Sequence, residues 1–122
     1  MPKRILVVDD STDTLEMYKA IIAKEGHEVE TAHSGRDALS KLNAGPFDLV
    51  LLDVFMPGMS GREVAEAIRA NPKLKNVKIA FLTIAERSTT GKTLVKDYAP
   101  VDYIQKPVAL KEFLARLRGL LS

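Results

Sequence analysis

Short apolar runs alternate with amphipathic segments along the chain of 122 residues. The apolar runs are rich in Val, Ile and Leu, and polar or turn-forming residues bound them, which is typical of strands. We expect strands over residues 4–8, 29–32, 48–53 and 77–83, and a shorter strand over residues 102–105. Because the runs are almost continuously apolar, they favour a parallel sheet that is buried on both faces.

The segments between these strands carry apolar residues at helical spacing, and several begin after a residue that can cap a helix. Ser11 or Thr12 precedes the first such segment, Ser34 the second and Ser60 the third. A weaker helical pattern runs to about residue 98, with poor helix formers at positions 89–91. The last segment is the clearest amphipathic helix, with apolar residues at positions 110, 113, 114, 117 and 121. Five such strand–helix units predict an α/β fold with helices on both faces of the sheet.

Composition fits one globular domain over residues 1–122. Hydrophobic residues make up 46% and charged residues 28%, and the net charge of +2 is too small to favour nucleic acid as the main partner. The chain has no Cys, and it carries neither a signal peptide pattern nor an apolar stretch of spanning length. We therefore expect a cytoplasmic protein without a membrane partner. Since the chain ends on a helical pattern, we also expect no output domain.

Acidic side chains follow two of the predicted strands. Asp9 and Asp10 end the first apolar run, and Asp53 ends the third. If these strands are parallel neighbours, the carboxylates meet at one edge of the sheet, where they repel one another. A hard divalent cation, Mg²⁺ above all, would relieve this repulsion and attract phosphate oxygens. The sequence therefore predicts a metal site at this edge.

Asp53 is the candidate nucleophile, because a carboxylate can accept a phosphoryl group as an acyl phosphate. The alternative is an ordinary strand-terminal Asp in a turn. Asp9 and Asp10 make that alternative less favoured, although either of them could instead cap the first helix.

Residues at the ends of the last two strands could complete the site. The Lys106 ammonium could pair with the acids or with a phosphoryl oxygen, and Pro107 is a candidate for a cis peptide bond. The Thr83 hydroxyl could donate to a phosphoryl oxygen. The alternatives are a solvated lysine and an ordinary β-branched strand residue. Tyr103 could be a switch, but the sequence alone favours a place in the core.

Together these motifs resemble the receiver domain of two-component response regulators, the CheY-like family. The motifs are Asp9-Asp10 after an apolar strand, Asp53 followed by Met56-Pro57-Gly58-Met59-Ser60-Gly61, then Thr83, and finally Tyr103-Ile104-Gln105-Lys106-Pro107. Each motif is weak alone, but the ordered set is specific and covers essentially the whole chain. The resemblance implies a doubly wound, flavodoxin-like three-layer sandwich with strand order 2-1-3-4-5 and five helices.

The resemblance also implies the metal site in detail. Asp53 would be the phosphoacceptor and, with Asp10 and the backbone carbonyl of Phe55, a direct ligand of Mg²⁺. Asp9 would hold the metal through water.

The resemblance further implies a switch. Lys106 and Thr83 would contact phosphoryl oxygens, and Tyr103 would move inward with Thr83 after phosphorylation. The phosphoryl group would come from a sensor histidine kinase, a phosphotransfer protein or a small-molecule donor. The face formed by helix 4, strand 5 and helix 5 would bind a downstream protein or a second copy of the chain. Such a domain catalyses only its own phosphorylation and dephosphorylation, and it does not itself contact nucleic acid.

The chain departs from the family pattern at three places. Ile84 stands where a small residue is usual, Pro100-Val101 where Gly-Ala is common, and the apolar Phe55 where a polar side chain often helps position the hydrolytic water. The bulky Ile84 would slow phosphodonor access or hydrolysis, and Phe55 would not help position the water, so we expect a long-lived phosphorylated state.

Three other functions compete with this interpretation. A haloacid-dehalogenase-like phosphatase places its nucleophile in an Asp-x-Asp motif after the first strand, whereas Asp53 follows the third. A flavodoxin-type FMN carrier needs a neutral loop after the first strand, where Asp9 and Asp10 would repel the flavin phosphate. A pseudo-receiver that binds partners without phosphorylation would not need the complete set of site residues, although Ile84 keeps this alternative open.

Overall fold

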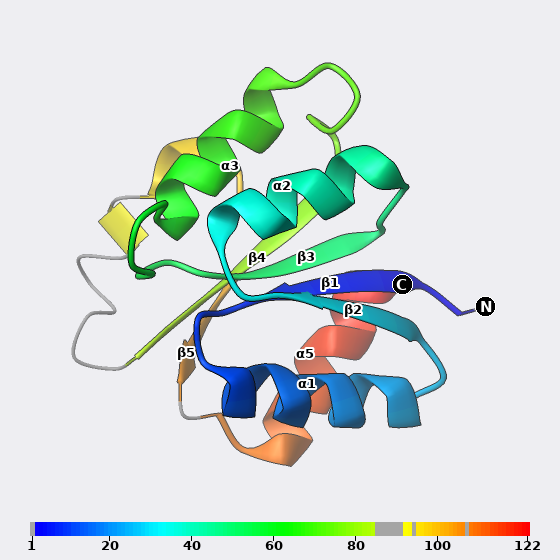
Figure 1. The fold of residues 1–122 in the computed structure, drawn as a ribbon. Coiled ribbons are helices and arrows are strands. Elements are labelled where there is room, and N and C mark those ends of the chain that lie inside the picture. The colour runs from blue at the N-terminus through cyan, green and yellow to red at the C-terminus, as the bar shows by residue number, and fades with distance from the viewer. Residues whose placement is uncertain (1, 85–91, 94, 107) are drawn as a thin grey trace.

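A parallel sheet forms the middle layer of the molecule (Figure 1). The structure is a computed structural model that describes residues 2–84, 92–93, 95–106 and 108–122. The sheet has five strands in the order β2-β1-β3-β4-β5, all paired in parallel. In chain order the strands are β1 (Arg4–Val8), β2 (Glu28–Ala32), β3 (Leu49–Asp53), β4 (Lys78–Ile84) and β5 (Asp102–Lys106).

Helices cover both faces of this sheet. The α-helices of the described residues are α1 (Thr12–Lys24), α2 (Gly35–Ala44), α3 (Gly61–Ala70) and α5 (Leu110–Leu121), and a short 3₁₀-helix, η2, spans Lys96–Tyr98. Figure 1 shows α2 and α3 on one face of the sheet and α1 and α5 on the other. The predicted three-layer α/β sandwich is confirmed. The predicted fourth helix falls largely on residues 85–91 and 94, which lie outside the described residues.

Serine caps begin the first three helices, as the sequence predicts. Ser11, Ser34 and Ser60 each accept a hydrogen bond from the backbone N–H three residues later. Thr12 is the first residue of α1 rather than its cap. The predicted apolar face of α5 is only partly buried: Phe113 and Leu117 are buried, whereas Leu110 at the start of the helix is 56% exposed.

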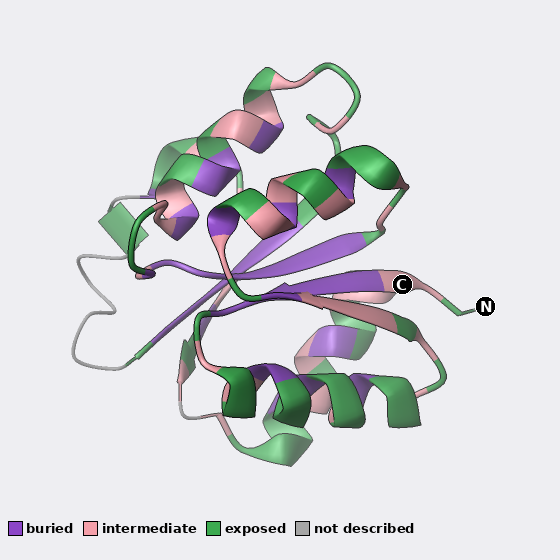
Figure 2. Ribbon diagram, in the orientation of Figure 1, coloured by how far each residue is buried: buried purple, intermediate pink, exposed green. Residues whose placement is uncertain are grey.

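The core lies on both sides of the sheet. β1, β3 and most of β4 are buried and form the centre of the middle layer (Figure 2). One apolar cluster packs under α2 and α3, and a second packs under α1 and α5. The chain leaves β1 and β3 toward opposite faces, which opens a crevice at the carboxyl ends of these neighbouring strands. Among the described helices, none is both long enough and apolar enough to cross a membrane.

Candidate functional site

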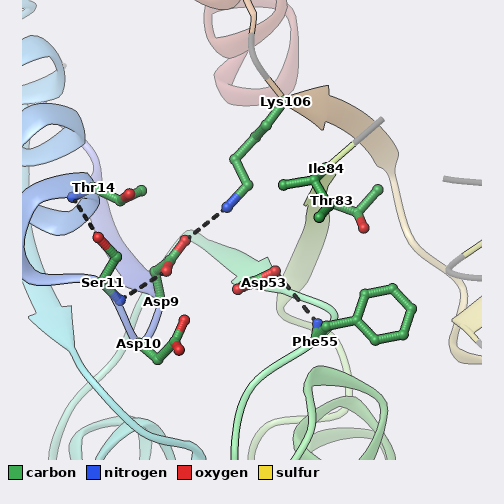
Figure 3. Close-up of a pocket in the computed structure, with 9 residues that line it drawn as sticks. All are labelled: Asp9, Asp10, Ser11, Thr14, Asp53, Phe55, Thr83, Ile84 and Lys106. Carbon is green, nitrogen blue, oxygen red and sulfur yellow. Dashed lines mark hydrogen bonds and ion pairs between the residues drawn. The ribbon is translucent and has the colours of Figure 1, made fainter. Parts of the chain in front are cut away.

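Three carboxylates meet at the carboxyl ends of β1 and β3. Asp9 and Asp10 follow β1, which ends at Val8, and Asp53 is the last residue of β3. Each of the three offers a carboxylate oxygen within 4.8 Å of the others. Asp9 and Asp53 are buried, at 2% and 7% exposure, whereas Asp10 is exposed. The parallel pairing of β1 with β3 therefore brings together the three acids that the sequence singled out (Figure 3).

Asp9 is the most fully engaged of these acids. Its Oδ2 lies 3.0 Å from the Nζ of Lys106, and its Oδ1 accepts a 3.0 Å hydrogen bond from the backbone N–H of Ser11. Asp53 accepts a longer hydrogen bond of 3.4 Å from the backbone N–H of Phe55. The ammonium thus lies beside Asp9, while Asp53 is held only weakly by its surroundings.

The electrostatics of the cluster raise the pKa of Asp53 to about 6. Burial is the largest cause, and the negative charges of Asp9 and Asp10 add to it. The charge of Lys106 and the N–H of Phe55 oppose this rise only in part. The cluster is therefore short of positive charge, and its oxygen donors are of the kind that hard divalent cations bind.

The acids line an open pocket of about 240 Å³. Its lining brings together most of the sequence-predicted site residues, includes Ile84 as expected, and adds Ser11 and Thr14; the full set is Asp9, Asp10, Ser11, Thr14, Asp53, Phe55, Thr83, Ile84 and Lys106. Ser11 and Thr14 did not figure in the predicted site, although their place just after the acid pair was a signal for them. Pro107 lies outside the described residues, so the predicted cis bond stays a prediction.

Thr83 presents a buried hydroxyl to this pocket. The residue is 0% exposed, and within the described part of the chain its Oγ1 has no hydrogen-bond partner. Buried polar groups are usually paired, so such an atom at a pocket wall is suited to bind a ligand oxygen. Ile84, the next residue, is 39% exposed at the rim. In Figure 3 the ring of Phe55 points away from the three carboxylates.

Tyr103 lies beside this pocket without lining it. It is half-buried on β5, whereas the sequence alone favoured the core. The Nζ of Lys92 lies 5.4 Å from the centre of its ring. Burial raises the pKa of the Tyr103 hydroxyl, and interaction with the Thr83 side chain opposes part of that rise. The Tyr103 hydroxyl therefore lies near the Thr83 side chain on the neighbouring strand.

A glycine fixes the backbone behind Asp53. A Cβ on Gly61 would lie 2.0 Å from the backbone oxygen of Asp53, and the Gly61 N–H donates a 2.8 Å hydrogen bond to the carbonyl of Val54. The N-terminus of α3 is thus seated directly on the end of β3. The sequence showed Gly61 only as part of a turn, and its close approach to Asp53 appears only in three dimensions.

Comparison with protein families and curated proteins gives one consistent match. The model of the response regulator receiver domain matches residues 5–118. The response regulator MprA of Mycolicibacterium vanbaalenii is 40% identical over 121 residues, which are 99% of this chain and 51% of that protein. A CpxR homolog of Haemophilus influenzae, a transcriptional regulatory protein, is 36% identical over 118 residues, or 97% of this chain and 50% of that protein. The chain thus spans about half the length of these curated relatives.

Solved structures agree with these matches. The chemotaxis protein CheY4 of Vibrio cholerae superposes with a TM-score of 0.90 at 33% identity, covering 99% of this chain and 100% of that one. The response regulator TrrA of Thermotoga maritima, solved in complex with Mg²⁺ and BeF, superposes with a TM-score of 0.84 at 39% identity, covering 98% of this chain and 99% of that one.

Proposed function

We propose that Asp53 is the phosphoacceptor of this chain, which belongs to the receiver domain family of two-component response regulators. Members of this family act in phosphorelay signalling. The observation that carries the proposal is the difference between the two buried acids. Asp9 has both oxygens engaged by Lys106 and Ser11, whereas Asp53 faces the same pocket with one long hydrogen bond.

The pocket supplies the groups that phosphoryl transfer requires. An oxygen of Asp53 bonds to phosphorus as the bond from phosphorus to the imidazole nitrogen of the donor, or to the acyl oxygen of a small donor, breaks. The Lys106 ammonium and the buried Thr83 hydroxyl both line this pocket and could bind the phosphoryl oxygens. Such charge-assisted hydrogen bonds contribute roughly 1.5–3 kcal/mol each.

The acid cluster fits a divalent cation. Its carboxylate oxygens lie within 4.8 Å of one another, and burial, together with the negative charges of Asp9 and Asp10, raises the pKa of Asp53. Asp10, Asp53 and the backbone carbonyl of Phe55 would hold Mg²⁺ directly, and Asp9 would hold it through water. When bound, the cation supplies positive charge to the phosphoryl oxygens. The Mg²⁺–BeF complex of the Thermotoga relative supports this assignment.

The proposal also includes a conformational switch at Thr83 and Tyr103 and a surface that binds a partner after phosphorylation. Pairing of Thr83 with a phosphoryl oxygen would draw Thr83 toward Asp53 and let Tyr103 follow it inward, because the two side chains lie near one another. The face formed by helix 4, β5 and α5 would then bind a downstream protein or a second copy of the chain. A sensor histidine kinase or phosphotransfer protein would supply the phosphoryl group in the cytoplasm. Residues 1–122 would act as one receiver unit.

Incubation with acetyl phosphate and Mg²⁺, followed by intact mass measurement, tests the assignment. The wild-type chain is expected to gain one phosphoryl group and Asp53→Asn none. Asp13→Asn is the matched control, because Asp13 is an exposed acid in the first turn of α1 and lies outside the pocket. A phosphoryl gain on Asp53→Asn equal to that of the wild type would contradict the proposal.

A further inference from the structure

Arg69, near the end of α3, binds backbone carbonyls of two separate connections. Its Nε donates to Tyr98 O at 2.8 Å, and one of its terminal nitrogens donates to Ala99 O at 3.2 Å. The other terminal nitrogen donates to Lys75 O and to Val77 O, each at 2.7 Å. One guanidinium thus joins the segment that leads into β4 to the segment that leads into β5. Its rigid planar fork of donors makes this geometry specific to Arg.

The segment that Arg69 holds before β5 has an unusual backbone. Ala99 has a φ of 51°, and among the described residues it is the single non-glycine residue with a positive φ. A left-handed conformation is unfavourable for alanine by roughly 1–2 kcal/mol, so surrounding contacts must maintain it. The Val101 N–H then donates to Ile79 O at 2.9 Å and begins the pairing of β5 with β4. The contact with Arg69 therefore lies where the chain sets the course of β5.

A second contact joins the same segment to α3. The Tyr98 hydroxyl donates to Glu66 Oε2 at 3.3 Å, and Figure 1 shows α3 on the same face of the sheet as η2. At its other end α3 is seated on the backbone of Asp53 through Gly61. One short helix therefore contacts both the end of β3, which carries the candidate phosphoacceptor, and the segment that leads to Tyr103.

We infer that Arg69 is a positioning residue: by fixing the segment 98–101 against α3, it sets the resting position of Tyr103 on β5. The inference rests on the proposed function in so far as Tyr103 acts as the switch residue. Removal of the guanidinium would leave four carbonyls without this donor and would release the left-handed turn at Ala99. Tyr103 would then occupy more than one position before any phosphorylation.

Fluorine NMR of protein labelled with fluorotyrosine tests this inference. The chain has three tyrosines, so each resonance can be assigned from a Tyr→Phe variant. Without a phosphodonor, the wild type is expected to show one Tyr103 line, and Arg69→Gln a line split in two or broadened about twofold by exchange. The Tyr18 line should stay in place, because that ring packs 4.9 Å from Phe113 on the opposite face of the sheet.

Arg62→Gln is the matched control, since Arg62 is also on α3 and pairs with Glu66 at 3.6 Å but, among the described residues, donates no hydrogen bond to the segment 98–101. A Tyr103 line identical in Arg69→Gln and wild type would overturn the inference and leave Arg69 a purely structural role. If Arg69→Gln does not fold, Arg69→Lys keeps the charge but not the fork. A smaller change of the Tyr103 line in that variant is then expected, and no change would overturn the inference.

The same spectra separate this inference from the proposed switch. Addition of acetyl phosphate and Mg²⁺ to the wild type is expected to shift the Tyr103 line. Absence of that shift, in protein that has gained the phosphoryl group, would count against the switch role of Tyr103. The effect of Arg69 is measured without phosphorylation and would be judged separately.

Discussion

The two ends of the sheet differ in how their charged side chains are paired. At the amino end of the strands, Arg4 pairs with Glu30 at 2.6 Å and donates to the carbonyl of Pro46 at 3.0 Å, while its own N–H donates to Asp48 Oδ2 at 2.8 Å. Lys78 donates to Leu120 O at 2.8 Å. At the carboxyl end, three acids lie close together, the ammonium of Lys106 pairs with Asp9, and the hydroxyl of Thr83 is buried at the pocket wall.

This contrast separates structural charges from binding charges. Groups at the amino end have partners, so they hold connections in place and offer little to a ligand. Groups at the carboxyl end repel one another in the folded chain, and a divalent cation would relieve that repulsion and attract phosphoryl oxygens. The repulsion lowers stability, which is common at functional sites. The variants below test whether the carboxyl end is rigidly built and whether its charges are unsatisfied.

Gly61→Ala should have the largest effect, because it tests how rigidly the carboxyl end is built. The added Cβ would lie 2.0 Å from the backbone oxygen of Asp53, so α3 or β3 must move. We expect the free energy of unfolding, measured by urea denaturation, to fall by about 3–4 kcal/mol. Gly119→Ala in α5 is the control, since nothing lies within 4 Å of its added Cβ, and it should stabilise the protein by about 0.5–1 kcal/mol. A Gly61→Ala variant as stable as wild type would show that the backbone at Asp53 is not constrained.

Lys106→Met removes the ammonium that pairs with Asp9 and lowers the pKa of Asp53. Asp9 is 2% exposed and would lose its partner, so we expect a loss of about 2 kcal/mol in unfolding free energy near pH 7.5; the lysine is partly exposed, which keeps the loss below that of a fully buried pair. The pKa of Asp53 should also rise above about 6, because Lys106 lowers it in the wild type. NMR titration of the Asp53 carboxyl carbon measures this change. An unchanged pKa would mean that Lys106 does not act on Asp53.

The rim of the pocket should set the lifetime of the phosphorylated state. Ile84 lies at the rim and should slow the access of water to the phosphoryl group, and the apolar Phe55 supplies no polar group to position that water. The double variant Ile84→Ala, Phe55→Asn introduces a small and a polar side chain. We expect it to shorten the lifetime of the phosphorylated state by about tenfold, which corresponds to a hydrolysis barrier lower by about 1.4 kcal/mol. Loss of the phosphoryl group can be followed by intact mass after removal of acetyl phosphate. A wild-type half-life of seconds would contradict the expected slow hydrolysis.

Patterns local in sequence predicted most of the fold. The apolar runs indicated the strands to within a residue or two, and Ser11, Ser34 and Ser60 marked three helix starts, because capping depends on residues three positions apart. The family resemblance supplied the strand order. The acid cluster was predictable from Asp53 and its partners at strand ends, because parallel strands end at the same edge of a sheet.

Long-range contacts could not be predicted in the same way. The choice of Asp9 over Asp53 as the partner of Lys106 depends on distances between side chains of different strands. The contact of Gly61 with the Asp53 backbone and the four hydrogen bonds of Arg69 join segments that no local pattern connects. The contacts of Gly61 and Arg69 both arise from the packing of α3 against the sheet.

The contrast between the two ends predicts different effects on stability when Asp53 at the carboxyl end and Asp48 at the amino end are neutralised. At the carboxyl end, the folded-state pKa of Asp53 is raised to about 6, so its ionised form destabilises the fold above that pH. As the pH falls toward 4, protonation of Asp53 relieves this cost. The shift corresponds to at most about 3 kcal/mol, and the cost of burying an amide should reduce the gain from Asp53→Asn to about 1 kcal/mol.

The most direct test is the unfolding free energy of Asp53→Asn and Asp48→Asn, measured without divalent cations at pH 7.5 and again at pH 5. Asp53→Asn should be more stable than wild type at pH 7.5, and its advantage should shrink at pH 5. Asp48→Asn should match the wild type or fall slightly below it, because Asp48 already accepts the N–H of Arg4. An Asp53→Asn variant less stable than wild type at pH 7.5 would contradict the claim that the carboxyl end holds unrelieved negative charge.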